Sequence, residues 1–197
     1  SGFLGSPDQV SIIQRLYREY PSALRLVDPF GDAGQMYPTY TPELCEAMGA
    51  LADGADVLMP NLTEASILTK RDHPQDLDDA AVTELLDALL GLGAKNVVLK
   101  GIDHGDGKII NYVASAEKAL QKVELVHDKL PYMIHGTGDA FASALCGAVM
   151  AAAAWPIGSI AGEFVRHAME STRNQPHFEE RGVSFELDLG ELTSLVK

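Results

Sequence analysis

The sequence predicts one α/β domain over residues 1–197, built on a mostly parallel sheet with helices on both faces. Strand-like runs alternate with helical segments of roughly 10–15 residues, as in successive βαβ units. The composition is that of an ordinary globular chain: 197 residues, 46% hydrophobic and 22% charged. No repeat and no linker rich in proline, serine or glycine interrupts it. A chain of this length can bury a substantial core.

The first half of the chain begins with the end of a strand at residues 1–5. Ser6, Pro7 and Gln9 form a capping-box pattern, so a helix is expected from there to about residue 20. An apolar strand over residues 24–27 ends at Asp28. Further helices are expected over residues 41–52, 61–68 and 78–92, and a strand over residues 56–59.

The second half adds a strand over residues 96–100 and a hairpin whose turn is Asp106-Gly107. Strands are expected over residues 108–113 and 120–127. Two packed helices follow, over residues 138–153 and 157–171. A late strand is expected over residues 183–187, where apolar side chains alternate.

The charge balance excludes one class of partner. Twenty-eight acidic residues against 15 basic ones give a net charge of −13. A nucleic-acid or anionic-membrane binder needs a basic face, so neither partner is expected. Cys45 and Cys146 lie in apolar helical patterns and are expected to be reduced thiols. No run of 18 apolar residues and no leader pattern is present, so we expect a cytoplasmic protein without a membrane span.

The strongest chemical signal is His135-Gly136-Thr137-Gly138-Asp139, placed directly before an apolar helix. The glycines let the backbone approach a ligand, and the N–H groups of the helix N-terminus attract an anion. Asp139 could accept the proton of a hydroxyl that attacks phosphorus. The alternative is a tight turn in which Asp139 only favours the helix start.

A second signal is Asn61-Leu62-Thr63-Glu64, which follows a strand. Glu64 could reach back to cap the helix, and this is the favoured interpretation on spacing alone. The same carboxylate could instead hold a hydrated Mg²⁺, which prefers oxygen ligands.

Two other strand ends carry charged residues. Asp28 opens a glycine-rich turn that also contains Asp32, and Lys100 ends the strand of residues 96–100. Ligands of open α/β sheets bind at the carboxyl ends of the strands. Taken with the glycine turn, these residues supply the parts of a phosphoryl-transfer site: carboxylates for Mg²⁺, a lysine for phosphate, an anion-binding turn and a carboxylate base. We therefore expect Asp28, Glu64, Lys100 and the turn before Asp139 to share one cleft.

The ordered set of these motifs resembles the pyridoxal (pyridoxine/pyridoxamine) kinase family of the ribokinase-like superfamily. The segments that carry the resemblance are Ser1-Gly2-Phe3-Leu4-Gly5-Ser6, Val27-Asp28-Pro29, Pro60-Asn61-Leu62-Thr63-Glu64-Ala65, Val98-Leu99-Lys100 and His135-Gly136-Thr137-Gly138-Asp139. The resemblance implies a kinase that uses ATP and Mg²⁺, with K⁺ as a further candidate cation, to phosphorylate the 5′-hydroxymethyl group of a B6 vitamer. A homodimer is also implied.

The resemblance also assigns roles by position. Asp139 corresponds to the catalytic base and contacts the substrate, and Gly136, Thr137 and Gly138 to the anion hole. Glu64 and Asp28 correspond to the metal-side carboxylates, with Asn61 acting through water. The positions that correspond to the nucleotide site are Asp28, Met59, Glu64, Lys100, Leu125 and Val126. Phe3 falls where the family has a tyrosine beside the pyridine ring.

The chain departs from the family pattern in two places. Family members carry further βαβ units before the position of Ser1, so residues 1–197 correspond to about the C-terminal two-thirds of the family fold. The turn from Asp28 to Asp32 is one residue shorter than in the family, which leaves the role of Asp32 open.

Three alternatives stay open. One is a hydroxymethylpyrimidine (phosphate) kinase, which usually has cysteine at the position of Asp139. Another is a sugar kinase, which usually has alanine at the position of Thr137. The third is a nucleotide-binding fragment without catalysis.

Overall fold

The computed structural model describes residues 1–29, 40–74, 77–117, 122–151 and 158–195. Its contacts divide the chain into two compact units, which are described separately below. The first unit comprises Ser1–Ile102 and Tyr112–Glu124, and the second comprises Asp103–Asn111 and Leu125–Lys197. The prediction of one domain over residues 1–197 stays a prediction, because this division concerns compactness alone.

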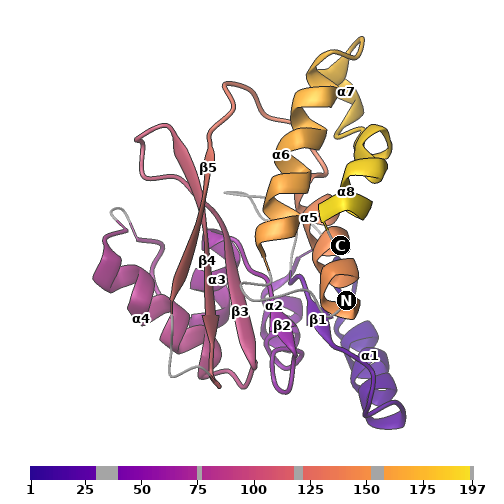
Figure 1. Cartoon of the computed structure of the whole chain (residues 1–197). Helices are drawn as coiled ribbons and strands as arrows, with labels where there is room; N and C mark the ends of the chain where they lie inside the picture. The colour runs from indigo at the N-terminus through magenta and orange to yellow at the C-terminus, as the bar shows by residue number, and fades with distance from the viewer. Residues whose placement is uncertain (30–39, 75–76, 118–121, 152–157, 196–197) are drawn as a thin grey trace. The chain divides into compact units, whose positions relative to one another are not determined.

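A five-stranded sheet in the order β1-β2-β3-β4-β5 forms the framework (Figure 1). Its strands are β1 (Leu26–Val27), β2 (Val57–Leu58), β3 (Asn96–Ile102), β4 (Lys108–Ser115) and β5 (Val123–Asp128). β1, β2 and β3 run parallel, with Leu26 opposite Val57 and Leu58 opposite Val97. Only five residues join β3 to β4, too few for a parallel crossover, so this pair is antiparallel. The expected α/β class is confirmed.

The start of the chain runs beside β1. The Ser1 ammonium donates to the Leu26 carbonyl at 2.7 Å, and the Asp28 N–H donates to the Ser1 carbonyl at 2.9 Å. These alternating bonds are those of a neighbouring parallel strand. They place the residues after Ser1 close to Asp28, at the carboxyl end of β1.

The helices described in the first unit are α1 (Pro7–Glu19), α2 (Pro42–Gly49), α3 (Leu62–Thr69) and α4 (Asp79–Leu90). Helices α3 and α4 pack on β3, and α1 packs on α2. Their apolar faces and the strands form a core in which Leu58, Leu86, Leu89 and Leu99 are almost fully buried. This burial is the main stabilising contribution, because apolar surface is removed from water.

The capping box expected at the start of α1 does not form, although α1 itself begins where the sequence predicts. The Ser6 side chain makes no cap hydrogen bond, whereas the Gln9 side chain accepts from the Gly5 N–H at 2.6 Å. The Gln9 side chain therefore binds the N–H of Gly5 instead of that of Ser6, and the Ser6 hydroxyl makes no bond to the helix start.

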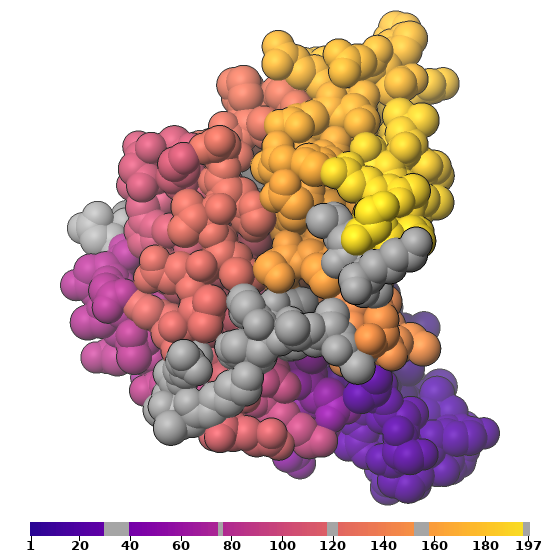
Figure 2. Space-filling view, in the orientation of Figure 1, coloured from indigo at the N-terminus to yellow at the C-terminus, as the bar shows by residue number. Residues whose placement is uncertain are grey.

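The second unit holds α5 (Thr137–Met150), α6 (Ser159–Arg173), α7 (Phe178–Arg181), the 3₁₀ helix η1 (Phe185–Asp188) and α8 (Leu189–Leu195). Helices α5 and α6 pack together, and η1 and α8 pack on α6. Figure 2 shows the C-terminal segment, in yellow, against the orange surface of α6. Leu145, Phe164 and Ala168 are among the buried side chains of this core.

The strand expected over residues 183–187 is wrong. The segment turns into η1 and α8, because its backbone groups bond to α6 and to itself instead of to a strand. The Ser184 N–H donates to the Thr172 hydroxyl at 2.8 Å, and Ser184 offers its carbonyl to the Leu187 N–H at 3.4 Å.

Cys45 is buried, Cys146 is half-buried, and both are free thiols, as expected. Burial raises the pKa of the Cys45 thiol. Among the described residues, no helix is both long and apolar enough to cross a membrane.

Candidate functional site

In the first unit, three parallel strands bring predicted site residues together. The sequence predicts that Lys100 ends its strand, but β3 continues to Ile102. Asp28 follows β1, Asn61 follows β2, and Lys100 lies in β3. Asn61 and Lys100 are paired in a parallel bridge, and the Lys100 N–H donates to the Pro60 carbonyl at 2.8 Å. The parallel register therefore places these residues at one edge of the sheet, as the sequence predicts.

Lys100 and Asp28 form an ion pair at this edge. Lys100 Nζ donates to Asp28 Oδ1 at 2.5 Å, and the two side chains are only 13% and 22% exposed. A pair so shielded from water interacts more strongly than a surface pair. The ammonium is thus held at the sheet edge, where a phosphate oxygen could share it with Asp28.

Glu64 closes a complete capping box at the start of α3. The Glu64 N–H donates to Asn61 Oδ1 at 3.0 Å, and Glu64 Oε2 accepts from the Asn61 N–H at 2.7 Å. The capping interpretation of Asn61 and Glu64 is therefore right. It does not exclude a second role, because a carboxylate offers about four lone-pair positions.

The fit of these residues to Mg²⁺ follows from their exposure. Glu64 is only 3% exposed, so its carboxylate could act on a metal through a water, whereas the Asp28 side chain can offer an oxygen directly. Mg²⁺ usually keeps several waters and uses one or two carboxylates together with substrate phosphates. The residues present fit that pattern. The described part of the chain contains no group of three or more His, Cys, Asp or Glu placed to hold a metal by itself.

Two more predicted residues differ in accessibility. Met59 is 1% exposed, so its side chain is core and a nucleotide could meet only its backbone. Phe3 is 67% exposed, and its ring packs edge-on against Tyr40 with the centroids 6.2 Å apart. Phe3 therefore presents an aromatic surface near Tyr40. Asp32 lies outside the described residues.

In the second unit, the glycine turn forms the start of α5. Gly136 is the N-cap residue, with φ of 83°, a left-handed conformation that glycine adopts without strain. The N-cap glycine has no side chain to accept from the first N–H groups, which in a helix N-terminus can bind an anion. Asp139 lies in the first turn and is exposed.

A cavity of about 640 Å³ opens beside this turn. Its lining includes Gly136 and Asp139 from the turn and Phe164 from α6. The other lining residues come from α5 and the residue before its turn (His135, Ala140, Ser143 and Ala144) and from the C-terminal segment (Glu180, Arg181, Gly182, Val183, Phe185, Leu189 and Leu192). The volume is that of a small-molecule site, mostly apolar with a few polar groups.

This C-terminal wall escaped the sequence reasoning. The apolar residues Phe185, Leu189 and Leu192 are spaced four and three residues apart, and this helical spacing could have predicted it. The alternation over residues 183–187 overlapped that signal and suggested a strand instead.

The predicted nucleotide positions of β5 lie in the second unit. Leu125 is 9% exposed and Val126 is 51% exposed, as expected for neighbouring residues that point to opposite faces of a strand. Val126 is thus the one of the pair that offers side-chain surface.

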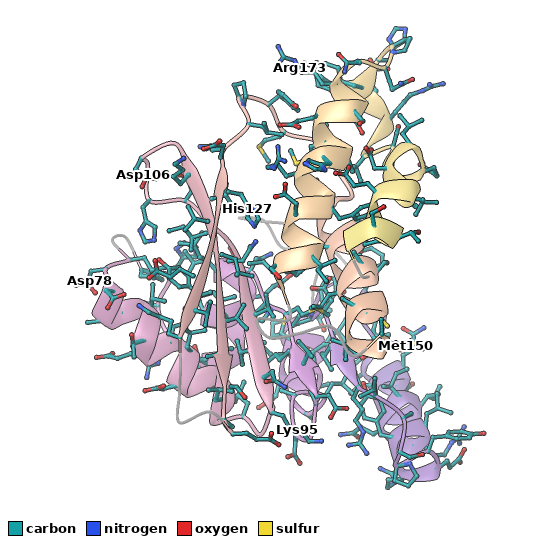
Figure 3. The ribbon with its side chains drawn as sticks, in the orientation of Figure 1. Asp78, Lys95, Asp106, His127, Met150 and Arg173 are labelled. Atoms are coloured by element: carbon teal, nitrogen blue, oxygen red, sulfur yellow. The ribbon has the colours of Figure 1, made fainter. Side chains whose placement is uncertain are left out.

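His127 follows Val126 and points from β5 toward α6 (Figure 3). A Cβ on Gly162 would lie 2.4 Å from His127 Nε2, so α6 has room for this ring only because residue 162 is glycine. Burial lowers the pKa of His127, an effect that the nearby Glu163 carboxylate partly offsets. His127 is therefore a packed, neutral side chain near pH 7, and no chemical role is assigned to it.

The predicted residues thus form two groups, one in each unit. Asp28, Asn61, Glu64 and Lys100 meet at the sheet edge of the first, and the turn of residues 136–139 lines the cavity of the second. That both groups share one cleft stays a prediction.

Solved structures define the class of fold. One similar structure is that of a protein from Bacteroides thetaiotaomicron VPI-5482, provisionally named a phosphomethylpyrimidine kinase and crystallised in an orthorhombic form with pyridoxal. The match covers 98% of this chain and 69% of the Bacteroides chain, with 28% sequence identity and a TM-score of 0.89. Pyridoxal kinase from Lactobacillus plantarum covers the same shares at 24% identity and a TM-score of 0.83. Pyridoxal kinase from Leishmania donovani, solved with ADP and pyridoxamine, also covers these shares, at 21% identity and a TM-score of 0.78.

These likenesses identify the fold as that of the ribokinase-like α/β kinases. The family model described as phosphomethylpyrimidine kinase matches residues 1–181. The chain therefore belongs to the phosphomethylpyrimidine kinase family, whose solved structural relatives include pyridoxal kinases, and is homologous to phosphotransferases with an alcohol acceptor. A comparison with curated proteins found no match.

Proposed function

We propose that the chain transfers the γ-phosphoryl group of ATP to the 5′-hydroxymethyl group of pyridoxal, pyridoxine or pyridoxamine. The observation that carries this proposal is Asp139, an exposed carboxylate in the first turn of α5 that lines a cavity of about 640 Å³ next to an uncapped helix N-terminus. A base and an anion-binding turn side by side are what an attacking hydroxyl and a transferring phosphoryl group require.

Each group has a distinct task in this reaction. The Asp139 carboxylate accepts the hydroxyl proton as the oxygen attacks the γ-phosphorus. The N–H groups that follow Gly136 stabilise the negative charge on the phosphoryl oxygens. The acceptor oxygen–phosphorus bond forms while the bond from phosphorus to the bridging oxygen breaks, and ADP leaves with that electron pair.

The residues of the first unit are assigned to the nucleotide. Lys100 neutralises phosphate charge, and Asp28 and Glu64, with Asn61 through water, would hold Mg²⁺. When bound, Mg²⁺ neutralises charge on the phosphates. Met59 contributes its backbone, and Phe3 packs beside the pyridine ring. From the second unit, Leu125 and Val126 are also assigned to the nucleotide.

The choice of acceptor is supported by two observations. The Bacteroides relative was crystallised with pyridoxal, and the Leishmania relative with ADP and pyridoxamine. The carboxylate at position 139 is the second, because hydroxymethylpyrimidine phosphate kinases usually have cysteine there. The description of the matching family model favours hydroxymethylpyrimidine phosphate as the competing acceptor.

The test is ADP release by the purified chain with ATP, Mg²⁺ and each acceptor in turn, with and without K⁺. Replacing Asp139 by asparagine removes the base, and we expect kcat with pyridoxal to fall about 10²–10⁴-fold. Asp8→Asn is the matched control, since Asp8 is also an exposed aspartate in the first turn of a helix, α1.

Each outcome has one meaning. Turnover of the wild type with B6 vitamers and its loss in Asp139→Asn support the proposal. Turnover with hydroxymethylpyrimidine phosphate alone assigns the other acceptor. Equal turnover by wild type and Asp139→Asn shows that Asp139 is not the base.

We also propose that the protein is a cytoplasmic homodimer. The family resemblance supports the dimer, and the net charge of −13 gives no basic face for nucleic acid or a membrane. Sedimentation of the purified chain tests the dimer, and a monomer at micromolar concentration would overturn it.

A further inference from the structure

The cavity beside Asp139 carries a charged group to which the reaction above gives no task. Besides Asp139, its lining includes Glu180 and Arg181, both exposed. Within the described residues that line the cavity, Arg181 is the one side chain with a permanent positive charge. A guanidinium at this position can bind an oxyanion through paired hydrogen bonds.

The backbone around Arg181 is tied to the glycine turn. The Val183 N–H donates to the His135 carbonyl at 2.9 Å. Gly182, which lies between Arg181 and Val183, has φ of 78°, and a Cβ on it would lie 3.1 Å from the His135 carbonyl oxygen. His135 immediately precedes the N-cap of α5, so these contacts fix the residue after Arg181 next to the anion-binding turn.

A second tie runs to α6. The Ser184 N–H donates to the Thr172 hydroxyl at 2.8 Å, and Thr172 is fully buried. The backbone just after Arg181 is thus anchored at two successive residues, Val183 to His135 and Ser184 to Thr172. A guanidinium on an anchored backbone loses less freedom on binding than one on a free loop.

Arg181 is not neutralised by the protein. Across the described residues, no hydrogen bond or ion pair engages its side chain, although Glu180 and Asp139 line the same cavity. Arg166, in the same unit, is by contrast paired with both Glu163 and Glu170. The guanidinium of Arg181 is therefore available to an anionic ligand.

We infer that Arg181 is a catalytic residue, and that its guanidinium binds the phosphoryl group while that group passes from ATP to the acceptor oxygen. This inference rests on the proposed function. In the transfer, the bridging oxygen–phosphorus bond breaks, the acceptor oxygen–phosphorus bond forms, Asp139 takes the proton, and ADP departs. Arg181 adds a permanent positive charge to the cavity that the start of α5 also lines, where the phosphoryl oxygens gain negative charge.

The experiment compares the wild type, Arg181→Gln, Arg181→Lys and the control Arg18→Gln, an exposed arginine of α1. We expect Arg181→Gln to lower kcat with the accepted vitamer about 10²–10³-fold, while KM for the vitamer and Kd for ADP change little. Arg181→Lys keeps the charge but not the paired donors, so its kcat should fall about tenfold. Arg18→Gln should match the wild type.

A binding measurement separates the phosphoryl contact from a structural role. Aluminium fluoride, added with ADP and Mg²⁺, imitates the transferring phosphoryl group and should tighten ADP binding to the wild type. Arg181→Gln should lose this tightening and still bind ADP alone. Circular dichroism shows whether each variant is folded. If Arg181→Gln is unfolded, the same kcat and ADP-binding measurements on Arg181→Lys test the proposal.

The two proposals fail in different ways. If the wild type phosphorylates a vitamer and Arg181→Gln or a folded Arg181→Lys does so equally well, the role of Arg181 is wrong and the proposed function stands. If the wild type phosphorylates no acceptor, the proposed function fails. In that case an ADP affinity that aluminium fluoride does not change also overturns the role of Arg181.

Discussion

Charged residues in this protein differ in how far their neighbours already satisfy them. Lys100 is held by Asp28 at 2.5 Å, and the Glu64 carboxylate accepts from the Asn61 backbone at 2.7 Å. Asp139 and Arg181 are exposed on a cavity instead. The first two are thus fixed in place before any ligand binds, whereas Asp139 and Arg181 are open to one. This contrast fits a division between positioning residues and residues that contact the reacting group.

His127 makes a prediction on pH dependence. Burial lowers its pKa from the ordinary value of 6.5, so the unfolded chain takes up a proton at a higher pH than the folded one. The folded state therefore loses stability as the pH falls below about 6.5. The His127→Gln variant should lose less of its unfolding free energy between pH 7.5 and pH 5.5 than the wild type does.

Urea denaturation at the two pH values measures this difference. His73→Gln is the control, because His73 is exposed and outside the core. The expected result is a wild-type pH dependence for His73→Gln and a weaker one for His127→Gln. If the free energy of unfolding changes equally with pH in all three proteins, His127 is not protonated on unfolding.

At the scale of elements, the helix starts differ in how they are capped. α3 has a reciprocal capping box, α1 has a serine whose side chain makes no cap bond, and α5 has a left-handed glycine and no side-chain cap. A helix without a cap exposes its N–H groups to solvent or to a ligand. α6 and α7 also make no side-chain cap bond, so the missing cap alone does not distinguish α5. What distinguishes α5 is that a left-handed glycine precedes it and Asp139 lies in its first turn, which fits an anion-binding role.

This difference predicts that replacing the N-cap residue by alanine destabilises the protein more in α3 than in α1. Asn61→Ala removes a cap that accepts from the Glu64 N–H, and it should lower the free energy of unfolding by about 1–2 kcal/mol. Ser6→Ala removes a hydroxyl that makes no cap bond, so its effect should stay within about 0.5 kcal/mol. Chemical denaturation of both variants measures the two values. Equal losses would mean that the caps do not differ in solution.

Sequence patterns predicted the elements well where period and capping agreed. The stretch around α4 has apolar residues at helical spacing, and α4 was found at Asp79–Leu90. The segment of η1 and α8 was missed, because its fold depends on contacts with α6 that are remote in sequence. Local periodicity carries no information about which surface a segment will meet.

At the scale of the whole molecule, the proposed reaction requires the two units to act on one nucleotide. Lys100 and Asp28 belong to the first unit, and Asp139 and Arg181 belong to the second. Parallel strands bring the first set together, and α5 with the C-terminal segment brings the second set together. That both sets bind the same nucleotide in one cleft is the prediction made from the sequence.

Hydrogen exchange tests this link. Binding of ADP with Mg²⁺ and aluminium fluoride should slow exchange at backbone amides near Asn61 and Lys100, and also at amides of the first turn of α5. The C-terminal amides near Val183 serve as a further probe of the cavity wall. Protection confined to one unit would contradict a single cleft.

The sequence by itself determined the α/β class, most element positions and the residue types for phosphoryl transfer, because these depend on local period, capping and turn chemistry. The tertiary structure decided that Asp28 pairs with Lys100 and that the Met59 side chain is core. It also decided that Arg181 lies on the cavity of Asp139. These facts depend on strand register and on the packing of η1 and α8 against α6, which join residues far apart in the chain.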